Sequence, residues 1–231
     1  MRISAPVSIL LAGSLLALPE AGSAPSPKAG KPNLVLLMAD DQGWGDMRYN
    51  GHPHLVTPNF DEAAAAGLRF DRFYAAAPVC SPTRASVMTG RTPNRMAVFK
   101  WGYPIRPQET TIAEALRTAG YRTGHFGKWH LGSVRTASPA NPGANGFDSW
   151  LSAPNFFEND PILCAEGKAV QTSGESSMVT VEAALQFMGK ALEENRPFLA
   201  VVWFGSPHGP HQAVDRDRGP YKDLPARDQH F

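Results

Sequence analysis

The first of the two cysteines lies in a segment whose residue types suit chemistry on an anion: Cys80-Ser81-Pro82-Thr83-Arg84. We predict a helix that begins near Ser81, with Ser81 as its N-cap and Pro82 at the first helical position, where the missing N–H costs nothing. Cys80 would then precede a helix amino end, whose unpaired N–H groups bind anions and favour a thiolate. Arg84 in the first turn would oppose the helix dipole by about 0.3–1 kcal/mol, which marks it as a functional candidate.

Polar residues follow three predicted strands at matching ends. They form three pairs: Asp40 and Asp41, Lys128 and His130, and His208 and His211. The carboxyl ends of parallel strands meet at one edge of a sheet, where ligand crevices form. We therefore expect these side chains to converge.

Asp40 and Asp41 are hard oxygen ligands beside a glycine-containing turn. Such ligands suit Ca²⁺ and, less well, Mg²⁺. Zinc is the competing hypothesis, because six histidines are available: His52, His54, His125, His130, His208 and His211. However, no pair has the HExxH spacing of helical zinc sites. His52 and His54 flank a proline in a predicted loop and could at most line a pocket.

Strands and helices alternate along the chain. Apolar runs predict strands at residues 33–38, 121–126 and 197–204, and the continuous run at 33–38 is typical of a parallel strand buried on both faces. Start and stop signals predict helices from Pro58 to Gly67, near Ser81, and over residues 110–119 and 175–194. Residues 133–174, rich in Pro, Asn, Gly and Ser, read as an irregular insertion. The alternation predicts an α/β fold, a mostly parallel sheet with helices on both faces.

The composition describes a loop-rich globular chain without charge bias. It has 231 residues, 22 Lys plus Arg against 21 Asp plus Glu, and a formal net charge of +1. This balance gives no electrostatic basis for binding nucleic acid, which we exclude as a partner. The 21 glycines and 21 prolines indicate many turns, and the length suffices for one sizeable core.

Residues 1–24 have the layout of a secretory signal peptide. Arg2 precedes an apolar run at residues 7–18, and small residues lead to Ala24. The run is too short to span a bilayer comfortably, so we expect secretion or export to the periplasm and no stable membrane insertion. Residues 25–32 read as a linker. In an oxidising compartment Cys80 and Cys164 could form a disulfide, which the sequence leaves open.

The cysteine segment resembles the sulfatase family. Residues 78–90 fit the family's first pattern, including its C-x-P-x-R core at Cys80, Pro82 and Arg84. The pattern is long and therefore specific.

Three other segments support the same resemblance. Residues 120–130 nearly meet the family's second pattern and depart from it at Phe126, where the family usually has a smaller residue. Residues 40–43 and 207–211 are similar to its metal and substrate segments. The segments occur in the expected order across about residues 32–215.

The resemblance implies an alkaline-phosphatase-like fold and an unusual nucleophile. In this family a formylglycine-generating enzyme oxidises the cysteine to an aldehyde, which becomes hydrated. One hydroxyl of the hydrate attacks sulfur and expels the alcohol; the other then loses its proton, and collapse releases sulfate and restores the aldehyde. Conversion of Cys80 would forbid a bridge to Cys164.

The resemblance also assigns the metal site. Asp40 and Asp41, with the modified Cys80, would hold Ca²⁺, which polarises the sulfate oxygens of the substrate. Arg84 would hold the modified side chain and its metal contacts by charged hydrogen bonds.

The remaining matched residues would handle the substrate. His130 would accept a proton from the hydrate. Lys128 and His208 would bind sulfate oxygens, and His208 could protonate the leaving oxygen. His211 either faces the substrate or lies in solvent.

One departure from the family concerns the far part of its metal site. Further Ca²⁺ ligands, an Asp followed by Asn, and a second catalytic Lys have no matching segment up to Phe231. We therefore expect residues 33–231 to be the N-terminal part of a sulfatase catalytic domain, truncated and incomplete.

Other functions remain open at the level of sequence. A phosphate or phosphonate monoester hydrolase of the same superfamily would use the same cations, and a folded but non-catalytic remnant is a second alternative. A cysteine hydrolase is disfavoured because nothing near Cys80 identifies its partner residues. The substrate is not readable: four aromatic residues could line a sugar or aryl pocket but are more often core. They are Trp44, Trp101, Tyr103 and Trp129.

Overall fold

The computed structural model describes residues 30–229. The predicted signal peptide and most of the predicted linker lie outside this range. Residues from Pro32 onward form one compact unit, which carries every element described below. Within the described residues no helix combines the length and the apolar character that crossing a membrane requires.

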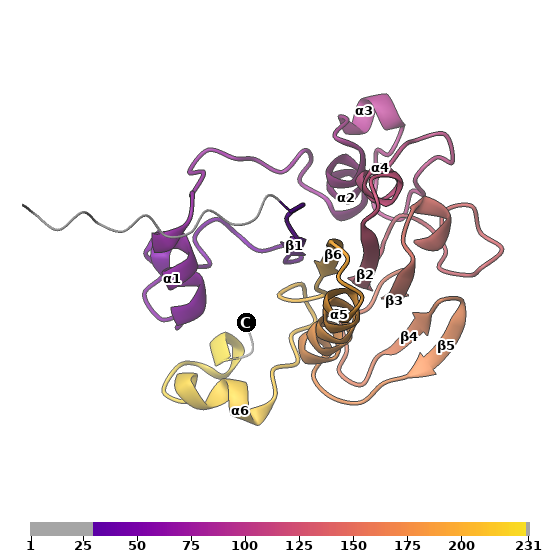
Figure 1. Cartoon of the computed structure of the whole chain (residues 1–231). Helices are drawn as coiled ribbons and strands as arrows, with labels where there is room; N and C mark the ends of the chain where they lie inside the picture. Colours follow the sequence, from indigo (N-terminus) through magenta and orange to yellow (C-terminus); the bar gives the residue numbers. More distant parts are fainter. Residues whose placement is uncertain (1–29, 230–231) are drawn as a thin grey trace, which may run out of the picture. The chain divides into compact units, whose positions relative to one another are not determined.

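The unit is built on a six-stranded mixed sheet (Figure 1). Three neighbouring pairs, β1 with β6, β6 with β2 and β2 with β3, are parallel, whereas β3 with β4 and β4 with β5 are antiparallel. In spatial order the strands are β1 (Leu34–Met38), β6 (Phe198–Trp203), β2 (Arg122–Lys128), β3 (Ser149–Ala153), β4 (Ile162–Ala165) and β5 (Lys168–Gln171). The predicted α/β class with a mostly parallel sheet is confirmed.

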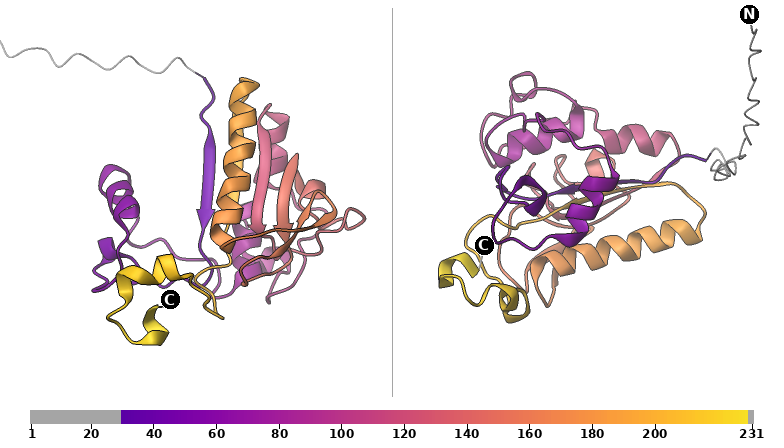
Figure 2. Two further views of the ribbon diagram at one scale, coloured as in Figure 1. Left: turned by 90° about the horizontal axis from the view of Figure 1, so that it is seen from below. Right: turned by 90° about the vertical axis from the view of Figure 1, so that its left-hand side faces the viewer.

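Strand β6 explains the core, because both of its faces are covered. Leu199, Val201 and Trp203 pack on one side, against helices α2 (Cys80–Thr89) and α4 (Ile112–Thr118). The alternate residues Phe198 and Val202 pack on the other side, against α5 (Ser176–Glu193). Figure 2 shows α5 in orange on one face of the sheet and the magenta helices on the opposite face. This is the doubly covered sheet that continuous apolar strands predict.

The helix ends follow local sequence signals. Helix α1 (Pro58–Ala66) begins after Thr57 with proline at its first position and ends at Gly67, as predicted. In α4 the Thr111 side chain accepts from the Glu114 N–H and the Glu114 side chain accepts from the Thr111 N–H, a capping box. The short remaining elements are α3 (Pro93–Met96), α6 (Asp215–Arg218) and the 3-10 turns Arg48–Asn50, Gly143–Asn145, Gly219–Tyr221 and Ala226–Gln229.

Two predictions about the sheet were wrong. Residues 133–174 are not an irregular insertion, because they contain β3, β4 and β5 and widen the sheet by three strands. Strand β1, expected to be buried on both faces, is an edge strand on which Val35 and Leu37 are exposed. An apolar run indicates a strand but not whether a second neighbour covers it.

Candidate functional site

The carboxyl ends of β1, β6 and β2 bring the predicted polar residues together. These three strands are adjacent and parallel. Asp40 follows β1 and its backbone N–H donates to Ser206 O (2.9 Å), beyond β6. Lys128 is the last residue of β2 and contacts the Asp40 carboxylate, and His208 Nε2 lies 3.4 Å from Asp41 Oδ2. The predicted convergence at this sheet edge is confirmed for Asp40, Asp41, Lys128 and His208, but His211 lines a neighbouring cavity.

Helix α2 supplies Cys80 and Arg84, with a start that differs from the prediction. The helix begins at Cys80, after Val79 in an extended conformation, so neither Ser81 nor Pro82 has its predicted position. Cys80 is therefore the first helical residue, and Arg84 belongs to the second turn, where the dipole argument does not apply. Residues four apart lie on one face of a helix, so both side chains reach the same site.

Arg84, Lys128 and Asp40 form a buried charge cluster. Arg84 donates to Asp40 Oδ1 (2.9 Å) and to the backbone oxygen of Lys128 (3.0 Å). Its guanidinium also lies 5.0 Å from the centre of the Trp203 ring. Lys128, which is fully buried, donates to Asp40 Oδ2. Two cations surround one carboxylate, so the cluster carries a net positive charge that a bound anion can balance.

The environment keeps Asp40 ionised. Burial alone would raise the pKa of its carboxyl group, but the positive charges of Arg84 and Lys128 outweigh burial and lower the pKa below its usual value. An ionised Asp40 can serve both as the counter-ion of the two cations and as a metal ligand.

Asp40, Asp41 and Cys80 are the candidate metal ligands. Their ligand atoms all lie within 4.8 Å of one another, and no other group of three or more such residues comes together within residues 30–229. Asp41 has a left-handed backbone (φ 59°), and Cys80 Sγ lies 3.9 Å from its Oδ1. Two carboxylates fit a hard cation such as Ca²⁺ or Mg²⁺. No histidine joins this group, so the zinc hypothesis has no ligand set in the described part of the chain.

The prediction that the helix amino end favours a thiolate at Cys80 is wrong. Burial and the negative charge of Asp40 raise its pKa, and the nearby Lys128 lowers it only in part. The helix amino end therefore does not produce a thiolate here. Both cysteines are free, and Cys164 on β4 contacts Val134 O (3.4 Å).

A cavity of about 270 Å³ opens beside Cys80. Lys128, His130 and His208 line one part of it, and Trp101, which is 71% exposed, lines another. The nucleophile candidate and three of its predicted partners thus face a single space. The aromatic residues that the sequence analysis considered as pocket residues differ in position. Trp101 lines the cavity, whereas Trp129 lies in the core, where its indole N–H donates to Ala140 O (2.7 Å). Trp44 and Tyr103 are exposed and do not line it.

His130 and His208 differ in their surroundings. His130 is buried, its Nδ1 has no hydrogen-bond partner among the described residues, and burial together with Lys128 lowers its pKa to about 4. It is therefore a neutral proton acceptor at neutral pH. His208 Nδ1 contacts Gly209 O, which directs Nε2 toward Asp41.

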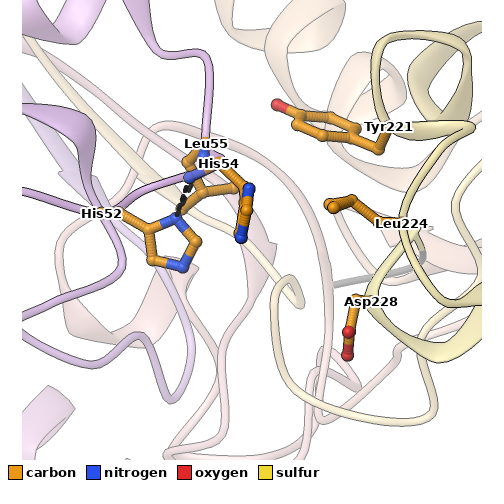
Figure 3. A pocket seen from close by; sticks show the side chains of 6 residues that line it. All are labelled: His52, His54, Leu55, Tyr221, Leu224 and Asp228. Atoms are coloured by element: carbon orange, nitrogen blue, oxygen red, sulfur yellow. Dashed lines mark hydrogen bonds between the residues drawn. The ribbon is translucent and has the colours of Figure 1, made fainter.

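The other histidines within residues 30–229 lie outside this cavity. His125 is fully buried and contacts Ser152 Oγ (2.7 Å), so it belongs to the core. His211 lines a neighbouring cavity that also reaches His208. His52 and His54 line a separate pocket, in which they face Tyr221, Leu224 and Asp228 (Figure 3). The expectation that they could line a pocket is correct, but the pocket is not that of Cys80.

Two residues of the cavity wall were missed by the sequence analysis. Asn155 and Phe157 follow β3 and line the cavity beside Lys128 and His208. They obey the same rule as the other site residues, since β3 is parallel to β2 and its carboxyl end lies at the same edge. The rule could not be applied because β3 was not recognised.

Comparison with known proteins gives a consistent result. A sequence model of the family described as Sulfatase matches residues 32–229. N-acetylgalactosamine-6-sulfatase of Mus musculus is 42% identical over 245 residues, covering 90% of this chain and 45% of that protein. Arylsulfatase A of Homo sapiens is 43% identical over 141 residues, covering 58% of this chain and 27% of the relative.

Solved structures agree on the fold. The crystal structure of Ps i-CgsB in complex with k-i-k-neocarrahexaose superimposes with a TM-score of 0.80 at 27% identity, covering 86% of this chain and 50% of that one. The expected alkaline-phosphatase type of fold is confirmed for the described sheet. The chain spans less than half the length of the curated relatives it matches.

Proposed function

The chain belongs to the sulfatase family, and on that basis we propose that it acts as a sulfuric ester hydrolase on sulfate monoesters. The observation that carries the proposal is the shared cavity at the sheet edge. There Cys80 lies 3.8 Å from the ammonium of Lys128. The buried cluster of Arg84, Lys128 and Asp40 carries a net positive charge that attracts an anionic ester.

Lys128 and His208 bind the sulfate group in this proposal. Both line the cavity beside Cys80, and both can donate hydrogen bonds to sulfate oxygens. Lys128 is held by Asp40, so it presents its remaining N–H bonds from a fixed position. A fixed donor stabilises developing charge without the cost of reorganisation.

Cys80 and the two aspartates complete the proposed centre. The family chemistry converts Cys80 to formylglycine, and the hydrated aldehyde supplies the nucleophile. Ca²⁺, when bound by Asp40, Asp41 and the modified side chain, polarises the sulfate oxygens. Arg84 holds Asp40 through a charged hydrogen bond and so fixes one ligand of this set.

Two histidines divide the proton transfers. His130 has a pKa of about 4, so it is unprotonated at neutral pH and can accept a proton from the modified residue 80. His208 faces the cavity with Nε2 and can donate a proton to the leaving alcohol oxygen.

The substrate class we propose is a carbohydrate sulfate. The similar mouse protein is named for N-acetylgalactosamine 6-sulfate, and the superimposed structure holds a neocarrahexaose. Trp101, which lines the cavity and is 71% exposed, offers an aromatic face of the kind that sugar rings contact.

We further propose that the protein is exported before it acts. The support is the signal-like pattern of residues 1–24. The partner required during maturation would be a formylglycine-generating enzyme that acts on residue 80.

Expression together with a formylglycine-generating enzyme tests the function. The purified protein is assayed on an aryl sulfate and an aryl phosphate, with and without Ca²⁺, and the peptide containing Cys80 is analysed by mass spectrometry. We expect conversion of Cys80, a preference for sulfate and loss of turnover in Cys80→Ala. Cys164→Ala is the matched control, because its thiol lies on β4 away from the cavity, and it should retain activity.

Two outcomes would reject the proposal. A large preference for the phosphate ester would assign the site to a phosphate or phosphonate hydrolase. An unmodified Cys80 without Ca²⁺ binding or turnover would identify a non-catalytic member of the family.

A further inference from the structure

Phe157 lies between the two proposed sulfate-binding side chains. The Lys128 ammonium is 4.5 Å from the centre of its ring. On the same aromatic residue the imidazole of His208 stacks at a centroid distance of 4.2 Å and an interplanar angle of 15°. A single phenyl ring thus contacts both groups that face the cavity beside Cys80.

The ring completes the surroundings of Lys128. The buried ammonium donates to Asp40 and lies 3.8 Å from Cys80 Sγ, where the substrate would bind. The face of Phe157 is a further neighbour, with the ring centre 4.5 Å from the ammonium. The negative face of an aromatic ring attracts a desolvated cation, so Phe157 stabilises the charged lysine at this place.

The ring also fixes the orientation of His208. Nδ1 contacts Gly209 O and Nε2 faces Asp41, and these two contacts fix the direction in which each ring nitrogen points. Stacking on Phe157 determines its plane. Because the directions of the ring nitrogens and the plane of the ring are both fixed, Nε2 is directed into the cavity.

The loops that carry Phe157 and His208 are joined to each other. Asn159 Nδ2 donates to Gln212 O (2.8 Å), and the Asn159 N–H donates to Gln212 Oε1 (3.3 Å). Gly205, between β6 and His208, approaches so closely that a Cβ there would lie 2.5 Å from Phe156 O. The stacked pair is therefore held by its backbone as well as by its rings.

We infer that Phe157 is a positioning residue that orients Lys128 and His208 as one anion-binding pair. The inference rests on the proposed function for the identity of the anion, a sulfate group. It goes beyond that function because Phe157 has no polar group and takes no part in proton transfer or metal binding.

Binding of inorganic sulfate, measured by calorimetry on the full chain, tests the inference. Phe157→Leu keeps an apolar side chain but removes the ring, and we expect about tenfold weaker sulfate binding because two ring contacts are lost. Phe157→Tyr keeps the ring and should restore affinity to within about threefold. Phe60→Leu, on the exposed surface of α1, removes a ring elsewhere and is the matched control.

A spectroscopic measurement separates positioning from a general loss of structure. In the wild-type protein the ring current of Phe157 should displace the His208 Hε1 resonance upfield, and the displacement should disappear in Phe157→Leu but persist in Phe157→Tyr. The midpoint of thermal unfolding should be similar for both variants. In the active enzyme kcat/KM should follow sulfate affinity, with the tyrosine variant rescued.

Three results would overturn the inference: equal sulfate affinity in the leucine and tyrosine variants, an equal loss in Phe60→Leu, or no sulfate binding by the wild-type chain. These outcomes are distinct from failure of the proposed function, which is decided by turnover of the aryl sulfate. A wild-type chain that binds sulfate through the pair but hydrolyses no sulfate ester would reject the function and keep the positioning role.

Discussion

Asp40 and Asp41 are neighbours in the chain but lie in opposite environments. The Asp40 side chain is 3% exposed and contacts Arg84 and Lys128, whereas the Asp41 side chain is 56% exposed. One side of the site is therefore set by the sheet and α2, and the other side faces open space. The comparison shows that the described residues pack closely around Asp40, whereas they leave Asp41 open to solvent.

The segment before α2, residues 68–74, is also exposed on the side of the site where Asp41 lies. Leu68, Phe70, Phe73 and Tyr74 are all largely exposed, although their side chains are apolar. Phe73 and Tyr74 share a cavity of about 640 Å³ with Asp41 and Cys80. Charged groups are buried on one side of Cys80 and aromatic rings are exposed on the other, the reverse of the usual distribution.

Substitution of the two aspartates is the strongest test of this contrast. Asp40→Asn should lower the free energy of unfolding by about 3–5 kcal/mol, because Arg84 and Lys128 lose the charge that balances them. Asp41→Asn, at the exposed position, should change it by less than about 0.5 kcal/mol. Urea denaturation of both variants measures the difference, and equal effects would show that the two environments do not differ as described.

The pH dependence of stability tests the burial of His130, on the same side of the site as Asp40. The pKa of His130 is about 4 in the folded protein, below the ordinary value of 6.5. The unfolded chain therefore takes up a proton at higher pH than the folded protein. The stability that neutral His130 provides is complete above pH 6.5 and is lost as the pH falls from 6.5 to about 4, by at most about 3 kcal/mol.

His130→Gln should flatten this part of the stability curve. Unfolding free energies at pH 7 and pH 4.5 should differ less in the variant than in the wild-type protein. His54→Gln, at an exposed histidine of the separate pocket, is the control and should leave the curve unchanged. An unaltered slope in His130→Gln would contradict the burial of this imidazole.

The smallest effect is expected on the open side. Phe73→Ala should change the free energy of unfolding by less than about 0.5 kcal/mol, since the ring is 82% exposed. Leu199→Ala, in the middle of β6, should cost about 2–5 kcal/mol. Thermal and urea unfolding measure both, and a large cost for Phe73→Ala would mean that the aromatic segment is packed.

The sequence predicts best those parts of the molecule that depend on local pattern. The apolar runs located β1, β2 and β6, and the parallel arrangement then placed Asp40, Lys128 and His208 at one edge. Cap residues located α1 and the ends of α5.

Features that depend on distant contacts were not predictable. Strand β4 is apolar but only four residues long, and β5, also of four residues, has exposed polar side chains at both ends, Lys168 and Gln171, so neither gives a clear strand signal. Phe157 contacts Lys128 at the end of β2 and His208 in the loop after β6, and nothing in its own segment indicates these partners. Burial, followed by the negative charge of Asp40, raises the pKa of Cys80, and neither can be read from the sequence around the cysteine.

The one-turn spacing between Cys80 and Arg84 has a consequence for how this segment can evolve. Arg84 is anchored to Asp40 and to the end of β2, so the helix cannot rotate without breaking those bonds. A single-residue insertion or deletion between the two positions would swing residue 80 around the helix axis by about 100° and carry it away from the cations. A substitution at Thr83 does not change the angle between residues 80 and 84 around the helix axis. We therefore expect related sequences to differ in this segment by substitutions and not by insertions or deletions.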